Sequence, residues 1–150
     1  MRLSKNFTLS ELTKSQSAER LNLDNTPNAE TIDNLRFLCD HILQPIRNAL
    51  GPLVVSSGYR SHALNRAIGG SATSQHMLGL AADIECPGMD NQKLAEWIYK
   101  NIPIWDQLIL EFYTPGQPQS GWVHVSINPQ GVNRKQSLII NKQGTRSWSP

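Results

Sequence analysis

Gln107-Leu108-Ile109-Leu110-Glu111-Phe112-Tyr113 and Trp122-Val123-His124-Val125-Ser126-Ile127 are two strand-like segments joined by a loop rich in Pro, Gly and Ser. This pattern predicts a β-hairpin with its loop at residues 114–121. Because side chains alternate along a strand, one apolar face is expected to enter the core. That face consists of Leu108, Leu110, Phe112, Val123 and Val125. Glu111 and His124 then share the other face, and a symmetric register places them directly opposite each other.

Helical patterns dominate the first part of the chain. Thr8 and Glu11 form a capping-box pattern, and the clearest helix runs from about Asn28 to Leu50, with Pro45 expected to kink or split it. Further elements are expected at residues 53–57 (strand), 61–68 (helix), 80–85 (strand), 91–100 (helix) and 138–140 (edge strand), with 144–150 loosely held. Helices first and mixed strands later predict an α+β fold with a small antiparallel β-sheet.

Composition narrows the class of protein. The chain has 150 residues, which suits one domain, 1–150. Hydrophobic residues make up 39% and charged residues 17%, which excludes a disordered chain and a membrane protein. A net charge of +2 does not indicate nucleic acid as a partner. We expect a monomer without membrane insertion, with Cys39 and Cys86 as reduced thiols.

The N-terminal segment bears on where the protein is made. MRLSKNFTLSEL contains no apolar stretch long enough for a signal peptide. Synthesis in the cytoplasm is therefore expected, and action outside the cell would require release by another component.

Two of the four histidines have surroundings that suit a metal. His76 follows a Gly/Ser-rich loop and precedes small residues and Asp83, while His124 lies on the predicted hairpin. Two histidines and one carboxylate leave a tetrahedral zinc ion with one open position, which is a catalytic arrangement. His41 and His62 are expected to be surface or structural residues.

Glu111 is the candidate general base for water activated by such a metal, because it shares the predicted hairpin face with His124. Glu85 and Asp106 are weaker rivals that share no predicted face with His124. Arg60 follows a strand end and can present its planar guanidinium to a carboxylate or a developing oxyanion. The alternative for Glu111 is a solvent-facing strand residue without a catalytic role. The alternative for Arg60 is an ordinary surface arginine.

These motifs together resemble those of one peptidase family. Ser57-Gly58-Tyr59-Arg60-Ser61, Ser74-Gln75-His76 with Asp83, and Trp122-Val123-His124-Val125-Ser126 are similar to motifs of the zinc D-Ala-D-Ala carboxypeptidase-like M15 peptidases. The compact phage and prophage branch is the most similar. The resemblance covers about residues 5–128 and leaves a C-terminal tail at 129–150.

The resemblance implies a fold and a set of site residues. It implies an α+β fold of the hedgehog/DD-peptidase type, with helices packed on one side of the sheet. It implies zinc bound by His76, Asp83 and His124, and peptidase activity on cell-wall peptides. Substrate contacts are assigned to Arg60, Ser74, Gln75 and Trp122, with Arg60 also in a catalytic role. In several members the catalytic carboxylate stands three residues before the last histidine, a position occupied here by Gly121, so Glu111 is the expected base.

Two functional hypotheses from different classes follow. The first is a zinc peptidase that cleaves peptidoglycan stem peptides as a lytic enzyme of phage or prophage origin, released to the wall or carried in a virion. The second is a non-catalytic zinc-containing binding or structural module on the same fold. A zinc-free structural protein conflicts with the three retained ligands. The bond cleaved, whether D-Ala-D-Ala, L-Ala-D-Glu or a cross-link, stays open.

Overall fold

A mixed six-stranded sheet forms the centre of the computed structural model, which describes residues 1–150. The strands follow the order β3-β4-β6-β5-β7-β8. Their bounds are β3 Val54–Ser57, β4 Ala81–Glu85, β5 Gln107–Glu111, β6 Trp122–Ser126, β7 Gln136–Asn141 and β8 Gly144–Ser147. A separate two-stranded sheet joins β1 (Arg2–Ser4) to β2 (Phe7–Thr8). The α+β prediction is confirmed, although the parallel pairing of β5 with β7 makes the large sheet mixed rather than antiparallel.

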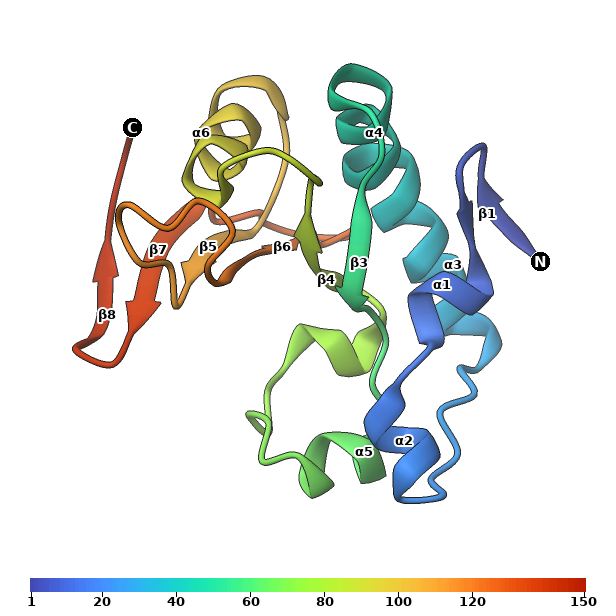
Figure 1. Cartoon of the computed structure of the whole chain (residues 1–150). Helices are drawn as coiled ribbons and strands as arrows, with labels where there is room; N and C mark the ends of the chain where they lie inside the picture. The colour runs from blue at the N-terminus through green and yellow to red at the C-terminus, as the bar shows by residue number, and fades with distance from the viewer.

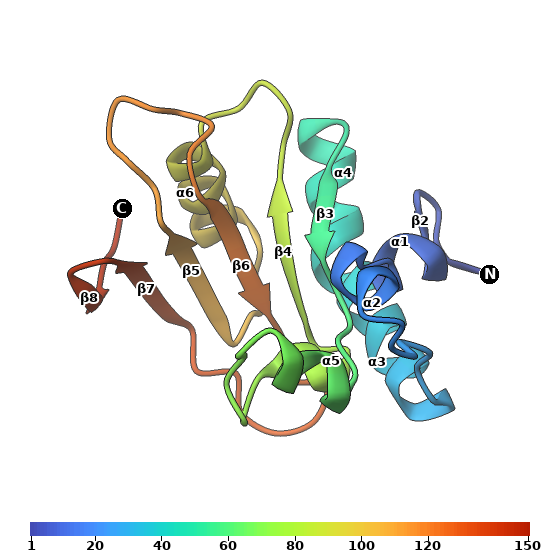
Figure 2. The ribbon, with the colours of Figure 1, turned by 60° about the horizontal axis from the view of Figure 1, so that its bottom comes forward.

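The helices divide between the two faces of this sheet. α3 (Ala29–Leu38), α4 (Gln44–Leu50) and α6 (Asn91–Asn101) lie on one side, and α5 (His62–Ala67) lies on the other (Figures 1 and 2). The remaining helices are α1 (Leu9–Thr13) and α2 (Gln16–Arg20). The core forms under α3, α4 and α6, because their apolar residues pack on the inward-facing residues of the strands. The opposite face is left free to carry polar side chains.

The long helix is interrupted rather than broken at its proline. Between α3 and α4, residues Cys39–Leu43 form a π-helical turn, η1, and the Gln44 N–H bonds to the Cys39 carbonyl five residues back. Pro45 removes the N–H that would continue the α-helical pattern at the start of α4. Asn28 caps α3, and Thr8 and Glu11 form the expected capping box.

The hairpin differs from the prediction in register and at one core residue. Glu111 lies opposite Trp122, and His124 lies opposite Ile109, a shift of two residues from the symmetric pairing. Phe112 was expected in the core but is 46% exposed, because β5 ends at Glu111 and Phe112 adopts φ 54°. A shift of two residues keeps every side chain on its face, so Glu111 and His124 still point the same way.

The C-terminal residues also differ from expectation. Residues 138–140 belong to β7, which is an internal strand between β5 and β8, and the edge is formed by β8. The segment 144–150, expected to be loose, is held by this pairing and by Trp148, whose indole N–H bonds to the Leu138 carbonyl at 2.8 Å. Residues 138–140 thus pair with β5 on one side and with β8 on the other.

Both cysteines are free and buried, and burial raises the pKa of the Cys39 thiol to about 12. None of the helices combines the length and apolar character that crossing a membrane requires.

Candidate active site

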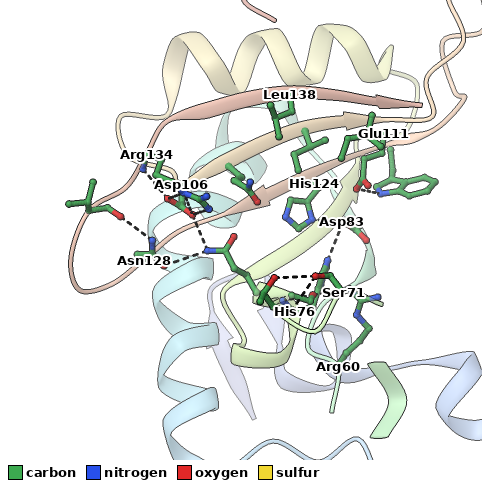
Figure 3. Close-up of a pocket in the computed structure, with 18 residues that line it drawn as sticks. Arg60, Ser71, His76, Asp83, Asp106, Glu111, His124, Asn128, Arg134 and Leu138 are labelled. Carbon is green, nitrogen blue, oxygen red and sulfur yellow. Dashed lines mark hydrogen bonds and ion pairs between the residues drawn. The ribbon is translucent and has the colours of Figure 1, made fainter. Parts of the chain in front are cut away.

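A cleft of about 800 Å³ lies on the sheet face opposite α6 (Figure 3). His76, Asp83 and His124 stand in its middle, with Glu111 at one end and the Asp106–Arg134 pair at the other. The cleft follows the neighbouring strands β5 and β6, so the sheet register sets the order of the groups along it.

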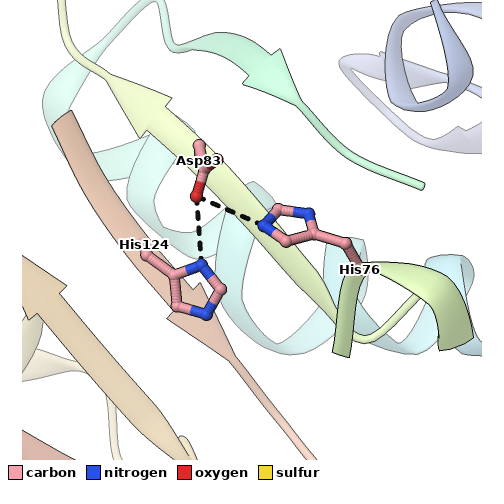
Figure 4. A group of neighbouring side chains, drawn as sticks. All are labelled: His76, Asp83 and His124. Atoms are coloured by element: carbon pink, nitrogen blue, oxygen red, sulfur yellow. Dashed lines mark hydrogen bonds and ion pairs between the residues drawn. The ribbon is translucent and has the colours of Figure 1, made fainter. Parts of the chain in front are cut away.

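Three elements bring the His–Asp–His group together. Asp83 on β4 is paired with His124 on β6, and His76 comes from the 3₁₀ turn η2 (Gln75–Leu78). The Asp83 Oδ1 atom lies 3.0 Å from His124 Nδ1 and 3.4 Å from His76 Nε2 (Figure 4). Two ligands of a tetrahedral zinc ion, each bound at about 2.1 Å, stand about 3.4 Å apart. The separations in the cleft therefore match a metal-ligand set.

The tautomer of His76 supports the same interpretation. Its Nδ1 atom lies 2.7 Å from the Gly58 carbonyl oxygen, which can only accept, so Nδ1 carries the proton. In the neutral ring, Nε2 then presents a lone pair toward the Asp83 carboxylate. A lone pair facing a carboxylate is unfavourable without a cation between them, and a backbone carbonyl behind a ligating histidine is the usual arrangement around metals. The residues present thus fit a bound metal ion.

The electrostatics of Asp83 agree with a ligand that stays ionised. Burial by itself raises the pKa of Asp83, but the adjoining imidazoles of His124 and His76 outweigh it and hold the pKa well below its usual range. The carboxylate is therefore available as an anionic ligand at neutral pH.

Gly79 makes the short path from His76 to Asp83 possible. It ends η2 with φ 73°, a conformation that glycine adopts without strain. A Cβ at this position would also press against the Thr31 carbonyl of α3. The turn can thus pack against α3 and return the chain directly into β4.

Glu111 lies in the cleft and is oriented by a neighbour. The Trp122 indole N–H donates to its Oε2 at 2.9 Å. Burial, reinforced by the charge of Asp83, raises the pKa of Glu111 above its ordinary value despite opposing effects of His124 and Trp122. A raised pKa suits a group that takes and returns protons.

Gly121 occupies the position where the resemblance would place a catalytic carboxylate, and the structure explains why a glycine stands there. Its φ is 64°, and a Cβ built there would collide with the Glu111 carbonyl oxygen. No side chain fits at 121 in this hairpin, so a carboxylate on this strand pair must come from elsewhere, and Glu111 is adjacent.

Arg60 lies at the cleft wall, partly buried. Its Nη2 donates to Ser74 Oγ at 3.1 Å, whereas Nε is buried without a partner. Burial lowers the pKa of Arg60, and the charges of Asp83 and Glu111 oppose that shift. A half-satisfied guanidinium beside the His–Asp–His group is placed to donate a hydrogen bond to a substrate oxygen.

The other candidates occupy less suitable positions. Glu85 accepts a hydrogen bond from Asn91 and does not line the cleft. Asp106 lines it but is bound by Arg134 and Gln75, so its lone pairs are occupied. His41 and His62 are exposed and far from the metal-ligand group, in agreement with the expectation of surface residues.

Sequence reasoning named Asp106 and Gln75 but missed Arg134 and the pairing of all three at the far end of the cleft. Asp106 is completely buried there, and Arg134 and Gln75 bind it from segments 28 and 31 residues away. Asn128 and Leu138 line the same end. The one available signal was an apolar segment that ends in an acid, Ile104-Trp105-Asp106, which suggests a buried carboxylate needing a partner.

The α+β fold, the His–Asp–His group and the adjoining arginine and glutamate define a candidate metallohydrolase. The model of the family described as Peptidase M15 matches residues 5–126, and the chain belongs to this family. A zinc D-Ala-D-Ala carboxypeptidase from Streptomyces albus G is 46% identical over 44 residues. That alignment covers 28% of this chain and 17% of the carboxypeptidase.

Proposed function

We propose that the protein is a zinc peptidase that hydrolyses peptide bonds in peptidoglycan stem peptides. The observation that carries this proposal is the group His76, Asp83 and His124, whose donor atoms converge at metal-ligand spacing inside a large cleft. Membership of the Peptidase M15 family and the local similarity to a zinc D-Ala-D-Ala carboxypeptidase support both the metal and the substrate class.

Each residue of the cleft has a role in the proposed reaction. Zinc held by the three ligands supplies Lewis acidity toward the carbonyl and makes water more acidic. Glu111 takes a proton from the attacking water and returns it to the leaving amine. Arg60 donates to the oxygen on which negative charge develops, since its Nε lacks a partner within the protein.

The remaining motif residues act on these groups and on the peptide. Ser74 fixes the guanidinium of Arg60, and Trp122 fixes the carboxylate of Glu111, in addition to the substrate contacts assigned to both. Gln75 lines the same cleft. We place the enzyme at the bacterial cell wall as a lytic enzyme of phage or prophage origin, acting after release from the cell or within a virion.

Digestion of purified murein tests the proposal. The zinc-loaded protein is expected to release peptide fragments, and mass spectrometry of their new ends identifies the cleaved bond. Glu111→Gln keeps the shape and removes the basicity, so turnover should fall roughly 10²–10⁴-fold while zinc stays bound. Normal turnover in this variant would show that the base lies elsewhere.

A non-catalytic zinc module is the second candidate, favoured by the glycine at position 121. Full zinc occupancy without release of any murein fragment would support this module and contradict the peptidase. Zinc content and fragment release, measured on the same preparation, therefore separate the two functions.

A further inference from the structure

We propose that Arg134, held in place by Asp106, forms with Gln75 a subsite that binds a carboxylate of the substrate peptide. The subsite lies about two residues along the cleft from the metal-ligand group. It rests on the proposed peptidase function and adds to it a determinant of substrate choice. The chemical class recognised is a peptide with a free carboxylate near, but not at, the reacting bond.

The sheet register places this subsite. The Asp106 N–H bonds to the Ser126 carbonyl at 2.7 Å, and Ser126 lies two residues beyond His124 on β6. Two strand residues span about 7 Å. Glu111 lies on the opposite side of His124 along β5, so an extended peptide in the cleft meets Glu111 and Arg134 at different positions (Figure 3).

Asp106 orients the guanidinium and leaves one edge of it free. Arg134 Nε lies 3.0 Å from Asp106 Oδ1 and Nη2 lies 2.6 Å from Oδ2, a two-point contact with a completely buried carboxylate. The Arg134 backbone N–H donates to the same carboxylate at 2.9 Å. No hydrogen bond engages Nη1, and the Arg134 side chain is 52% exposed. An arginine fixed on one edge offers its other edge to an anion with little loss of side-chain entropy.

Gln75 supplies the complementary acceptor. Its Nε2 donates to Asp106 Oδ2 at 3.1 Å, and because a carboxylate only accepts, this contact fixes which end of the amide points away. The Oε1 atom at that end is buried and has no partner. An unpaired buried acceptor is costly, and a peptide N–H entering the cleft would satisfy it. Free donors on Arg134 and a free acceptor on Gln75 together match a peptide unit that carries a carboxylate.

Arg134 comes from a part of the chain that the family model does not match, since the match ends at residue 126. The segment between β6 and β7 passes around the start of β5, and its Val132 and Arg134 line the cleft together with Leu138 of β7. This wall therefore belongs to the chain's own C-terminal segment and can differ in relatives that share the metal ligands.

A set of synthetic stem peptides tests the subsite, with each carboxylate replaced in turn by a carboxamide. Binding is measured by calorimetry to the zinc-loaded full-length protein carrying Glu111→Gln, whose turnover is slow. One replacement should weaken binding at least about tenfold, the size expected for loss of a charge-assisted hydrogen bond. The same replacement should have no effect when Arg134→Gln and Asp106→Asn are combined, a pair that removes both charges together.

Two further variants guard against misfolding and general charge effects. Arg134→Lys retains a charge near Asp106 but lacks the free edge, and it should lose most of the carboxylate preference. Arg66→Gln, an exposed arginine on α5, should retain the preference in full. Peptide binding with equal affinity for all carboxamides, or a preference that survives Arg134→Lys and the double variant, overturns the subsite and leaves the peptidase intact. Failure of every stem peptide to bind overturns the proposed function and the subsite together.

Discussion

The Gly58 carbonyl decides which nitrogen of His76 faces Asp83. By accepting from Nδ1 at 2.7 Å, it leaves Nε2 as the atom that can bind a metal. Only glycine fits at position 58 in this arrangement, because a Cβ there would collide with the Leu12 carbonyl oxygen. A glycine in the Ser-Gly-Tyr-Arg motif thus supports a ligand 18 residues away.

Removal of one ligand should abolish tight metal binding. His124→Ala leaves two of three donors, and we expect zinc affinity to fall by at least about 100-fold, since even loss of an outer partner of a ligand costs 10–100-fold. Titration with a competing chelator measures it. His62→Ala, an exposed histidine on α5, is the control and should keep full affinity. Stoichiometric zinc in the His124 variant would contradict the ligand assignment.

Arg60 should matter for turnover and not for the metal. Arg60→Lys keeps the charge but loses the planar donor set, so murein cleavage should fall by about 10²-fold, the cost of losing one oxyanion donor. Zinc content should stay unchanged, because the Arg60 guanidinium bonds to Ser74 rather than to a ligand side chain, and the backbone N–H that donates to the His76 carbonyl is retained in the variant. Unchanged cleavage would return Arg60 to the class of surface arginines; Arg66→Lys provides the matched control.

At the scale of elements, alternation along a strand predicted which face Glu111 and His124 share, but not their register. The face on which a side chain lies depends only on its place in the alternation along the strand. The apolar residues Leu108, Leu110, Val123 and Val125 reveal that alternation in the sequence. The register depends on where the strand ends, and that is set by the positive φ of Phe112 and its N–H bond to the Ile140 carbonyl of β7. A partner 28 residues away leaves no local signal.

Gly121 should be sensitive to even the smallest side chain. Gly121→Ala combines a positive φ with a collision against the Glu111 carbonyl, and we expect a loss of about 1–3 kcal/mol in the free energy of unfolding. Urea denaturation measures it. Gly116→Ala is a matched control in the same loop, because its φ is 86° but nothing lies near its Cβ position. An equal loss of unfolding free energy in the two variants would show that the contact with the Glu111 carbonyl oxygen does not add to the cost at position 121.

On the scale of the whole molecule, Asp106 ties three distant segments together. Burial raises the pKa of Asp106, but hydrogen bonds and the charge of Arg134 outweigh it and hold the pKa below its ordinary value. A carboxyl with a lowered folded-state pKa contributes stability above its unfolded pKa of about 3.9 and loses that contribution as the pH falls through the folded value.

The acid sensitivity of unfolding should therefore change with Asp106→Asn. At pH 7 the variant is expected to be less stable by about 1.5–3 kcal/mol, the range for hydrogen bonds to a charged group. Below about pH 4 the difference from the unmodified protein should shrink. Urea unfolding across this pH range measures it, with the exposed Asp33→Asn as control. A difference that stays constant with pH would mean that the Asp106 charge is not what stabilises the fold.

The α+β class, most element positions and the grouping of His76, Asp83 and His124 followed from patterns and motifs that are local in sequence. The partners of Asp106 and the pairing of β7 with β5 did not. Both join segments about 30 residues apart that share no periodicity, and tertiary packing alone selects them. The remaining site roles stay predictions for the experiments above.

The connection between β6 and β7 has a consequence for how this enzyme could be reshaped. The candidate metal ligands all lie between positions 76 and 124, whereas Asn128, Val132 and Arg134 lie together in one short surface stretch. Exchanging residues of that stretch other than Arg134, the partner of the buried Asp106, leaves the strands and the His–Asp–His group untouched. Substitutions confined to these few residues would thus change which peptides fit the cleft without changing the candidate metal ligands.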